Sequence, residues 1–285
     1  MTRPRSVAML VTGRPTMEGA GVRLNRVFGH QEVPRFDPFL LLDDFGSKNP
    51  DDYIAGFPWH PHRGIETVTY MLSGEVEHGD SIGNEGVIGA GDVQWMTAGS
   101  GIIHQEMPRR VGDHLRGFQL WANLPAASKM MEPRYRDIPA DTIPEVSPHD
   151  GLKIKVIAGE VVGVRGPVRD VVVEPEYLDI TLEPGADLEH PTQPDHTVFA
   201  YAINGRGKVG RNGSHELNRG QLALFTAGDS VIVKAGDVPF RFLLVSGKPL
   251  GEPVAWSGPI VMNTREELAT AFREYQDGTF IKQNR

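Results

Sequence analysis

Glycine and proline recur along the whole chain and divide it into many short segments. The 285 residues include 33 glycines and 22 prolines. They separate runs rich in β-branched and aromatic residues, such as VVVEPEYLDITLEPGADLEH and RGQLALFTAGDSVIVKAGD. Short runs of this composition, bounded by turn-forming residues, are typical of β-strands joined by tight turns. The pattern therefore predicts an all-β protein.

One segment near the end has the periodicity of a helix instead. Its apolar residues Leu268, Phe272 and Tyr275 fall on one helical face. Asn263 is placed to cap the first turn, with Glu266 three residues later as in a capping box. Gly278 supplies a stop at the other end. We expect a C-terminal α-helix after the strands.

Charge and cysteine content exclude several functions. The formal net charge is −8 and like charges form no long runs, so we expect no direct binding of nucleic acid or of a membrane surface. The chain has no cysteine, which rules out disulfides, thiolate metal ligands and cysteine nucleophiles. The apolar stretch near the N-terminus is only about five residues long, too short for a signal sequence or a membrane span. We therefore expect a cytoplasmic protein.

Two pairs of segments repeat at nearly the same interval. TYMLSGEVEHG at 69–79 resembles AYAINGRGKVG at 200–210, and GDVQWMTAG at 91–99 resembles GQLALFTAG at 220–228. The offsets are 131 and 129 residues. Two copies of one β-barrel unit explain them, joined by the proline-spaced stretch from Pro125 to Pro148. Chance similarity between glycine-rich hairpins is the alternative.

The first copy contains two pairs of side chains that suit a metal. In a strand, residues i and i+2 point to the same face. His60 and His62 in FPWHPHRGIETVTYMLSG would thus project side by side, as would His104 and Glu106 in GSGIIHQEMP. A lone His-x-His pair is more commonly exposed or hydrogen-bonded. Two such pairs beside glycine-rich turns instead predict three imidazoles and one carboxylate around one metal ion.

The second copy lacks this set of ligands. With the offsets of the repeat, the four candidate ligands align with Pro191, Gln193, Val233 and Ala235. A ligand set kept in one of two copies is better explained by function than by folding. A purely structural metal is a weaker alternative, because the second copy shows that the barrel folds without one.

Four other side chains are weaker candidates. Glu66 has an even spacing from His62 and could be a fifth ligand or accept a hydrogen bond from an imidazole N–H. His78 follows a turn glycine and is expected at a hairpin end. His190 and His196 are separated by two prolines, which favours a loop over a second metal site.

Long stretches of the sequence resemble the pirin family of bicupins. They are DPFLLLDDFG (37–46), HPHRGIETVTYMLSGEVEHGDSIG (60–83), GDVQWMTAGSGIIHQE (91–106), GFQLWANLP (117–125) and EPVAWSGPIVMNTREELATAFREYQDGTF (252–280). The resemblance implies two cupin-type β-barrels: an N-terminal metal-binding cupin domain at 1–136, and a metal-free C-terminal cupin domain with the terminal helix at 137–285. It also implies that the metal ligands are His60, His62, His104 and Glu106.

The ligand set suits several divalent transition metals. Three imidazoles and one carboxylate without a thiolate are compatible with Fe, Mn, Ni, Cu or Zn, and the resemblance favours one iron per chain. Four protein ligands on an octahedral metal would leave about two positions for water, dioxygen or a chelating substrate. Zn would settle at tetrahedral geometry.

Two functions of different classes follow from the resemblance. One is a quercetin 2,3-dioxygenase, which opens a small aromatic substrate (a flavonol) with dioxygen. Glu106 would then be the catalytic general base that takes the proton of the 3-hydroxyl. The other is an iron-dependent redox-sensing regulator that binds a transcription factor or a metabolic enzyme. An enzyme needs a cavity of a few hundred Å³ opening on the metal, and a regulator needs a surface that responds to the oxidation state. We favour the enzyme and expect a monomer.

Overall fold

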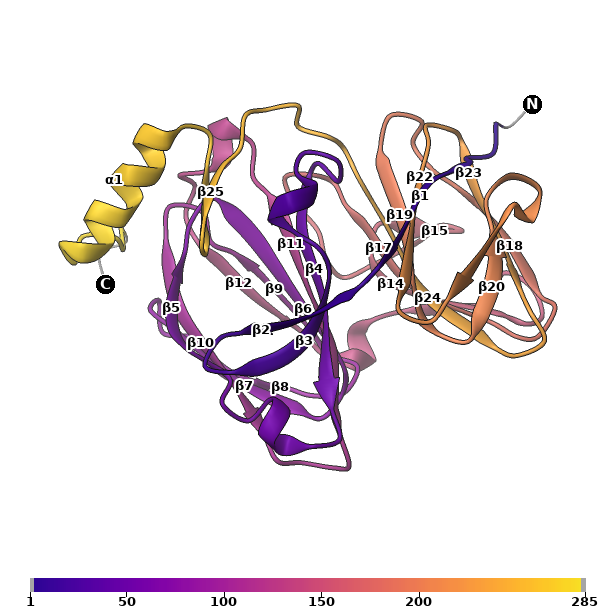
Figure 1. The fold of residues 1–285 in the computed structure, drawn as a ribbon, viewed down its shortest axis with the longest axis horizontal. Helices are drawn as coiled ribbons and strands as arrows, with labels where there is room; N and C mark the ends of the chain where they lie inside the picture. The colour runs from indigo at the N-terminus through magenta and orange to yellow at the C-terminus, as the bar shows by residue number, and fades with distance from the viewer. Residues whose placement is uncertain (1–2, 283–285) are drawn as a thin grey trace. The chain divides into compact units, whose positions relative to one another are not determined.

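The computed structural model describes residues 3–282 and divides the chain into two compact units. Residues 14–140 and 250–285 form one unit, here the N-terminal barrel. Residues 1–13 and 141–249 form the other, here the C-terminal barrel. The described residues form strands and one α-helix, α1 (Arg265–Gln276), near the C-terminus (Figure 1). The prediction of an all-β protein with a C-terminal helix is confirmed.

The N-terminal barrel consists of a seven-stranded and a four-stranded antiparallel sheet. Its strands are β2 (Arg14–Glu18), β3 (Val22–Phe28), β4 (Phe39–Ser47), β5 (Phe57–His62), β6 (Ile65–Ser73), β7 (Glu75–Asp80), β8 (Glu85–Ile88), β9 (Val93–Thr97), β10 (Ile102–Arg109), β11 (Leu115–Asn123) and β12 (Arg134–Ile138). The larger sheet has the order β12-β9-β6-β11-β4-β3-β2 and the smaller one β5-β10-β7-β8. A hairpin of β25 (Ala255–Ser257) and β26 (Ile260–Met262) completes this unit.

The C-terminal barrel repeats this arrangement. Its strands are β1 (Val7–Thr12), β13 (Glu145–Val146), β14 (Leu152–Ala158), β17 (Glu176–Leu182), β18 (Asp187–Pro191), β19 (Thr197–Asn204), β20 (Arg206–Val209), β21 (His215–Asn218), β22 (Gln221–Phe225), β23 (Ser230–Ala235) and β24 (Phe240–Gly247), with a small hairpin of β15 (Glu160–Val161) and β16 (Val164–Arg165). The sheet orders are β1-β22-β19-β24-β17-β14-β13 and β18-β23-β20-β21.

The two barrels match strand for strand, which confirms the repeat. In the larger sheets β9, β6 and β11 correspond to β22, β19 and β24, and the smaller sheets follow the same order. Both turn glycines of the repeat adopt positive φ, 78° at Gly74 and 73° at Gly205. Residues with a Cβ rarely adopt this conformation, so glycine at these two places fixes where each hairpin turns.

The compact units do not follow the sequence-based boundary at residues 136 and 137. β1, from the predicted N-terminal domain, pairs with β22 of the C-terminal barrel. α1, from the predicted C-terminal domain, lies beside β25 and β26 in the N-terminal barrel (Figure 1). Leu268 and Phe272 of α1 pack there on a cluster that contains Ile260 and Met262. Each end of the chain packs with strands that are remote from it in sequence. Local sequence patterns do not predict such long-range pairing.

The helix starts one residue later than predicted. Its cap is Thr264, whose Oγ1 accepts a hydrogen bond from the Glu267 N–H at 3.2 Å, while the Glu267 carboxylate accepts one from the Thr264 N–H at 3.0 Å. Asn263 instead donates its side-chain amide to Glu252 Oε2 at 3.0 Å, in the preceding loop. The described part of the chain contains no helix that is long and apolar enough to cross a membrane.

The interiors of the two barrels are filled differently. One large cluster of buried apolar side chains fills the C-terminal barrel, and it includes Leu178, Ile180, Val231, Val233 and Phe242. The N-terminal barrel has smaller apolar clusters and keeps a cavity of about 600 Å³. The N-terminal barrel therefore offers its interior to a ligand.

Candidate metal centre

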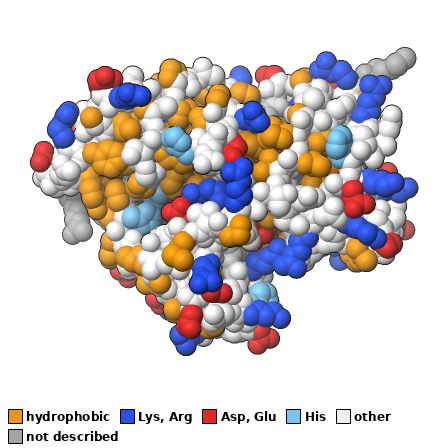
Figure 2. All heavy atoms as spheres, in the orientation of Figure 1, with side chains coloured by type: hydrophobic (Ala, Val, Ile, Leu, Met, Phe, Trp, Pro, Cys, Tyr) orange, Lys and Arg blue, Asp and Glu red, His pale blue; other side chains and the backbone are white. Residues whose placement is uncertain are grey.

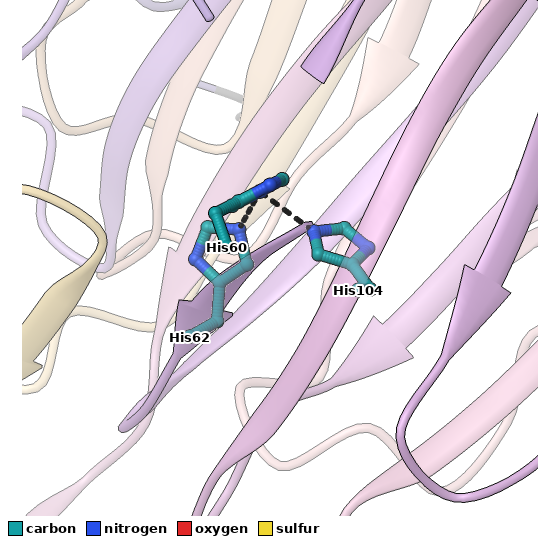
Figure 3. Close-up of side chains that lie close together, drawn as sticks. All are labelled: His60, His62 and His104. Atoms are coloured by element: carbon teal, nitrogen blue, oxygen red, sulfur yellow. Dashed lines mark hydrogen bonds between the residues drawn. The ribbon is translucent and has the colours of Figure 1, made fainter. Parts of the chain in front are cut away.

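Two neighbouring strands of the four-stranded sheet bring three histidines together. β5 and β10 pair with His60 opposite His104, and His62 lies two residues further along β5. Directly paired residues share a face, as do residues i and i+2. The rings therefore converge (Figure 3), with His60 Nε2 3.0 Å from His62 Nε2 and 2.9 Å from His104 Nε2. This is the one group of at least three metal-ligating side chains among the described residues.

Main-chain carbonyls orient two of the three rings. His60 Nδ1 lies 2.9 Å from Pro58 O, and His62 Nδ1 lies 3.1 Å from Pro259 O. A carbonyl oxygen can only accept a hydrogen bond, so each Nδ1 carries the proton and each Nε2 presents a lone pair. The lone pairs of His60 and His62 thus face each other at 3.0 Å. That arrangement is repulsive unless a cation lies between them.

Protonation of His62 or His104 is poorly suited to supply that positive charge. Burial lowers the pKa of His62 well below its ordinary value, and the nearby His60 lowers it further. Burial and then the surrounding imidazoles lower the pKa of His104 in the same way. Neutral imidazole is the form that ligates a metal. Three nitrogen donors with no thiolate fit a divalent transition metal, so the cluster could hold one metal ion.

Glu106 lies near this cluster but not within it. It follows His104 on β10 and lines the same cavity as His60 and His62. Among the described residues, however, the donor atoms that lie within 4.8 Å of one another belong to the three histidines. The pairing of β10 with β5 is irregular between His104 and Glu106. The extra residue lies on β5, because β10 pairs regularly with β7 from His104 to Arg109. The fourth ligand therefore stays a prediction from the sequence.

A chain of polar side chains holds the Glu106 carboxylate. Thr69 Oγ1 donates to Glu106 Oε1 at 3.1 Å, and it lies 2.9 Å from the side-chain amide of Gln119. A hydroxyl has one proton to donate, so the Gln119 amide turns its NH₂ group toward Thr69 when Thr69 donates to Glu106. The carboxylate is thereby oriented against β6, on the wall of the cavity.

Glu66 does not face the histidine cluster. It lies on β6 three residues before the cavity-lining Thr69, and hence on the opposite face of the strand. Its carboxylate accepts a hydrogen bond from Thr97 Oγ1 at 2.7 Å. The even spacing from His62 fails because β5 ends at His62, and Gly64, at φ +77°, turns the chain before β6 begins. Alternation does not continue through a turn.

His78 lies closer to the cluster than predicted. It sits within β7, opposite Glu106 on β10, instead of at a hairpin end. Its buried ring stacks on Tyr135, with 4.6 Å between the ring centroids, and lies 5.3 Å from the ring of His104. The signal available in the sequence is a further i, i+2 pair of ligand-type residues, His78 and Asp80.

The C-terminal barrel holds its buried histidine in a hydrogen bond to a glutamate. His190 lies on β18 instead of in a loop, and its Nε2 is 2.9 Å from Glu176 Oε1. The residue opposite it on β23 is Val231, which belongs to the apolar core. Val233 and Ala235, which align with the predicted ligands, are also buried in that core. The described part of this barrel therefore contains no second group of metal-ligating side chains.

The histidine cluster opens into the cavity of the N-terminal barrel. His60, His62 and Glu106 are among its lining residues. Most of the wall is apolar or aromatic, and it includes Leu41, Phe45, Phe57, Trp121 and Trp256. Trp121 stands edge-on to the ring of His62, with 5.1 Å between the centroids. Figure 2 shows apolar side chains gathered around histidine side chains on this barrel. The arrangement suits an aromatic ligand that reaches the histidine cluster.

The hairpin of β25 and β26 completes one side of the site. Trp256, Gly258 and Pro259 line the cavity, and the Pro259 carbonyl orients His62.

A buried lysine connects this hairpin to the barrel. Lys129 Nζ donates to Gly64 O at 2.9 Å, to Asn123 Oδ1 at 2.7 Å and to Val261 O at 3.0 Å. All three acceptors are uncharged, and burial lowers the pKa of Lys129 to about 8.

The low pKa of Lys129 predicts a rise in stability from about pH 8 to 10. In that range the unfolded chain keeps a proton that the folded chain has lost, so the free energy of unfolding increases with pH, by up to about 1.4 kcal/mol per unit. Lys129→Met should flatten this slope. Urea unfolding of both proteins at about pH 7.5, 8.5 and 9.5, with a chelator present, measures it. Equal slopes in both would show that Lys129 does not titrate there.

Both barrels match one known family. Residues 21–122 match Pirin, and residues 177–281 match the Pirin C-terminal cupin domain. The chain belongs to the pirin family. It is 46% identical to a pirin-like protein of Caulobacter vibrioides, over 97% of this chain and 99% of that protein. The pirin membership and the bicupin fold predicted from the sequence are confirmed.

Two further relatives carry the name of an enzyme. A Pseudomonas aeruginosa protein provisionally named quercetin 2,3-dioxygenase is 46% identical, over 98% of this chain and 99% of that protein. The crystal structure of a quercetin 2,3-dioxygenase from Acinetobacter baumannii superimposes with a TM-score of 0.90 at 32% identity, over 97% of this chain and 98% of that one. The pirins with this fold thus include proteins named for flavonol oxidation.

Proposed function

We propose that this pirin is a metal-dependent dioxygenase that opens flavonols such as quercetin. The observation that carries the proposal is the cavity of about 600 Å³, which His60, His62 and Glu106 line together with apolar and aromatic side chains. Its volume is typical of a site for a small organic ligand. The relatives from Pseudomonas aeruginosa and Acinetobacter baumannii that are named quercetin 2,3-dioxygenases support this choice of reaction.

We propose His60, His62 and His104 as metal ligands, with Glu106 as the fourth, and iron as the native metal. The lone pairs of the histidine cluster supply the nitrogen donors. A bound metal would act as a Lewis acid toward the flavonol oxygens and as the redox centre for dioxygen.

The side chains around the metal have separate tasks in this reaction. Glu106 takes the proton of the flavonol 3-hydroxyl, and Thr69, which donates to Glu106 Oε1, keeps the carboxylate turned for that transfer. Trp121 and Trp256 offer flat apolar surfaces to the aromatic rings and exclude water from the cavity. Overall, one dioxygen is consumed and one carbon monoxide is released for each flavonol opened.

The redox-sensing regulator stays an alternative from the resemblance. It requires no substrate cavity, so the cavity beside the histidine cluster favours the enzyme. The two functions also require different roles of Glu106, because only the enzyme has a substrate proton to remove.

Oxygen uptake by the iron-loaded protein tests the proposed function. Quercetin and dioxygen should be consumed in equal amounts, with an equal amount of carbon monoxide released. The matched control is the same preparation after removal of the metal with a chelator, which should be inactive. Iron-loaded protein that consumes no dioxygen with quercetin would overturn the proposal and leave the regulator.

A further inference from the structure

A row of polar side chains crosses the inner face of the seven-stranded sheet. Thr69 of β6 is paired with Gln119 of β11, Gln119 with Asp43 of β4, and Asp43 with Arg26 of β3. Directly paired residues on neighbouring strands point to the same side of a sheet. All four of these side chains line the cavity. We call these four side chains the polar row. Thr69, at one end of the row, donates a hydrogen bond to Glu106.

The polar row lies between apolar rows. Leu24 pairs with Phe45 on one side of it, and Leu41 pairs with Trp121 on the other, and all four residues line the cavity. An aromatic ligand packed on these rows would meet the hydrogen-bonding side chains of the polar row along the band between them. A few fixed polar groups in an apolar wall are what orients a ligand in such pockets and determines specificity.

Arg26 holds the carboxylate of Asp43 in a fixed position. Arg26 Nε and Nη2 donate to Asp43 Oδ1 and Oδ2 at 2.9 and 2.8 Å, and Arg26 Nη1 donates to Glu18 Oε1 at 2.7 Å. The Asp43 side chain is 6% exposed. Each carboxylate oxygen has two lone pairs, and the bidentate pair with Arg26 occupies one on each. Asp43 can therefore still accept a hydrogen bond from a ligand in the cavity.

The distance between the side chains of the polar row limits the size of the ligand that could contact both ends of it. Asp43 lies two strands away from Thr69, and neighbouring strands are about 4.8 Å apart, so the two positions are separated by about 10 Å along the sheet. A molecule that places one oxygen beside Glu106 therefore needs a second ring to reach Asp43.

We propose that Asp43 accepts a hydrogen bond from a hydroxyl on the outer ring of the substrate, so that the cavity selects flavonols hydroxylated on that ring. This inference rests on the proposed function, because the substrate class comes from there. Arg26 is a positioning residue, because its bidentate pair with Asp43 holds the carboxylate in place. A phenol that donates to a carboxylate makes a charge-assisted hydrogen bond, about twice as strong as a neutral one.

Calorimetric binding of two flavonols to the iron-loaded protein under nitrogen tests this inference. Quercetin has two hydroxyls on its outer ring and galangin has none. Wild type should bind quercetin about tenfold more tightly than galangin, and Asp43→Asn should reduce that preference to about threefold or less. Galangin affinity should stay within about twofold of wild type, which shows that the variant cavity is intact. Asp44→Asn is the matched control and should keep the preference, because Asp44 is the neighbouring carboxylate on the opposite face of β4, pairs with Arg116 and is not among the cavity-lining residues.

The outcomes separate this inference from the proposed function. An equal affinity of wild type for the two flavonols, or an unchanged preference in Asp43→Asn, would overturn the role of Asp43 even if quercetin is turned over. A preference that depends on Asp43 in a protein without turnover would support the role of Asp43 and overturn the dioxygenase. Failure of both flavonols to bind would overturn both.

Discussion

Glu106→Gln should lower flavonol turnover by about 10²–10⁴-fold, the usual contribution of a general base. The amide keeps an oxygen that can accept the hydrogen bond from Thr69, so the side chain should hold its position. It also keeps an oxygen that could ligate the metal, so part of the metal should remain bound. What the variant loses is the proton acceptor.

The matched control for this variant is Glu66→Gln. Glu66 is also a buried glutamate of the N-terminal barrel, but it bonds Thr97 on the face of β6 away from the cavity. We expect its turnover to stay within about threefold of wild type, since it contributes no group to the proposed reaction. Steady-state kinetics and metal analysis of both variants decide the question. Full turnover in Glu106→Gln would show that another group is the base. If the protein is a redox-sensing regulator, Glu106→Gln would instead shift the iron toward the ferrous state in a redox titration, because a neutral ligand replaces an anionic one.

His104→Ala should abolish metal binding and turnover while the protein stays folded. The change removes one of three nitrogen donors and the residue that pairs with His60 across β5 and β10. Metal affinity should fall by more than the 10–100-fold typical for loss of an outer hydrogen-bond partner. The fold should survive, because the C-terminal barrel forms the same sheets around an apolar interior, with His190 hydrogen-bonded to Glu176.

His190→Ala is the matched control for His104→Ala. Each variant removes one buried imidazole from the four-stranded sheet of its own barrel. The His190 variant should keep the full metal content, because its partner is Glu176 and not the histidine cluster. Metal analysis by mass spectrometry and thermal melts followed by circular dichroism give both readouts. Loss of the folded signal in His104→Ala would assign the metal a structural role.

The spacing of residues in the sequence was sufficient to predict the histidine cluster. Alternation places His60 and His62 on one face of β5, and the pairing of β10 with β5 places His104 opposite His60. The repeat was predictable for a similar reason, because the turn glycines Gly74 and Gly205 mark equivalent hairpins. Both predictions depend on local geometry that few residues determine.

Features that depend on strand pairing could not be predicted in the same way. The polar row exists only because Thr69, Gln119, Asp43 and Arg26 come into register across four strands, and their spacing in sequence carries no sign of it. The place of α1 in the N-terminal barrel is likewise set by contacts with β25 and β26. Glu66, a weaker candidate ligand, lies on the other face of β6 because the turn at Gly64 interrupts the alternation between β5 and β6.

Anomalous diffraction from crystals of the iron-loaded protein tests the central claim most directly. The account predicts one anomalous peak per chain, in the N-terminal barrel, at about 2.0–2.3 Å from the Nε2 atoms of His60, His62 and His104. Density from Glu106 that reaches the same peak would establish the fourth ligand. A peak at another place, a second peak of equal height, or no peak at the three histidines after iron loading would contradict the account.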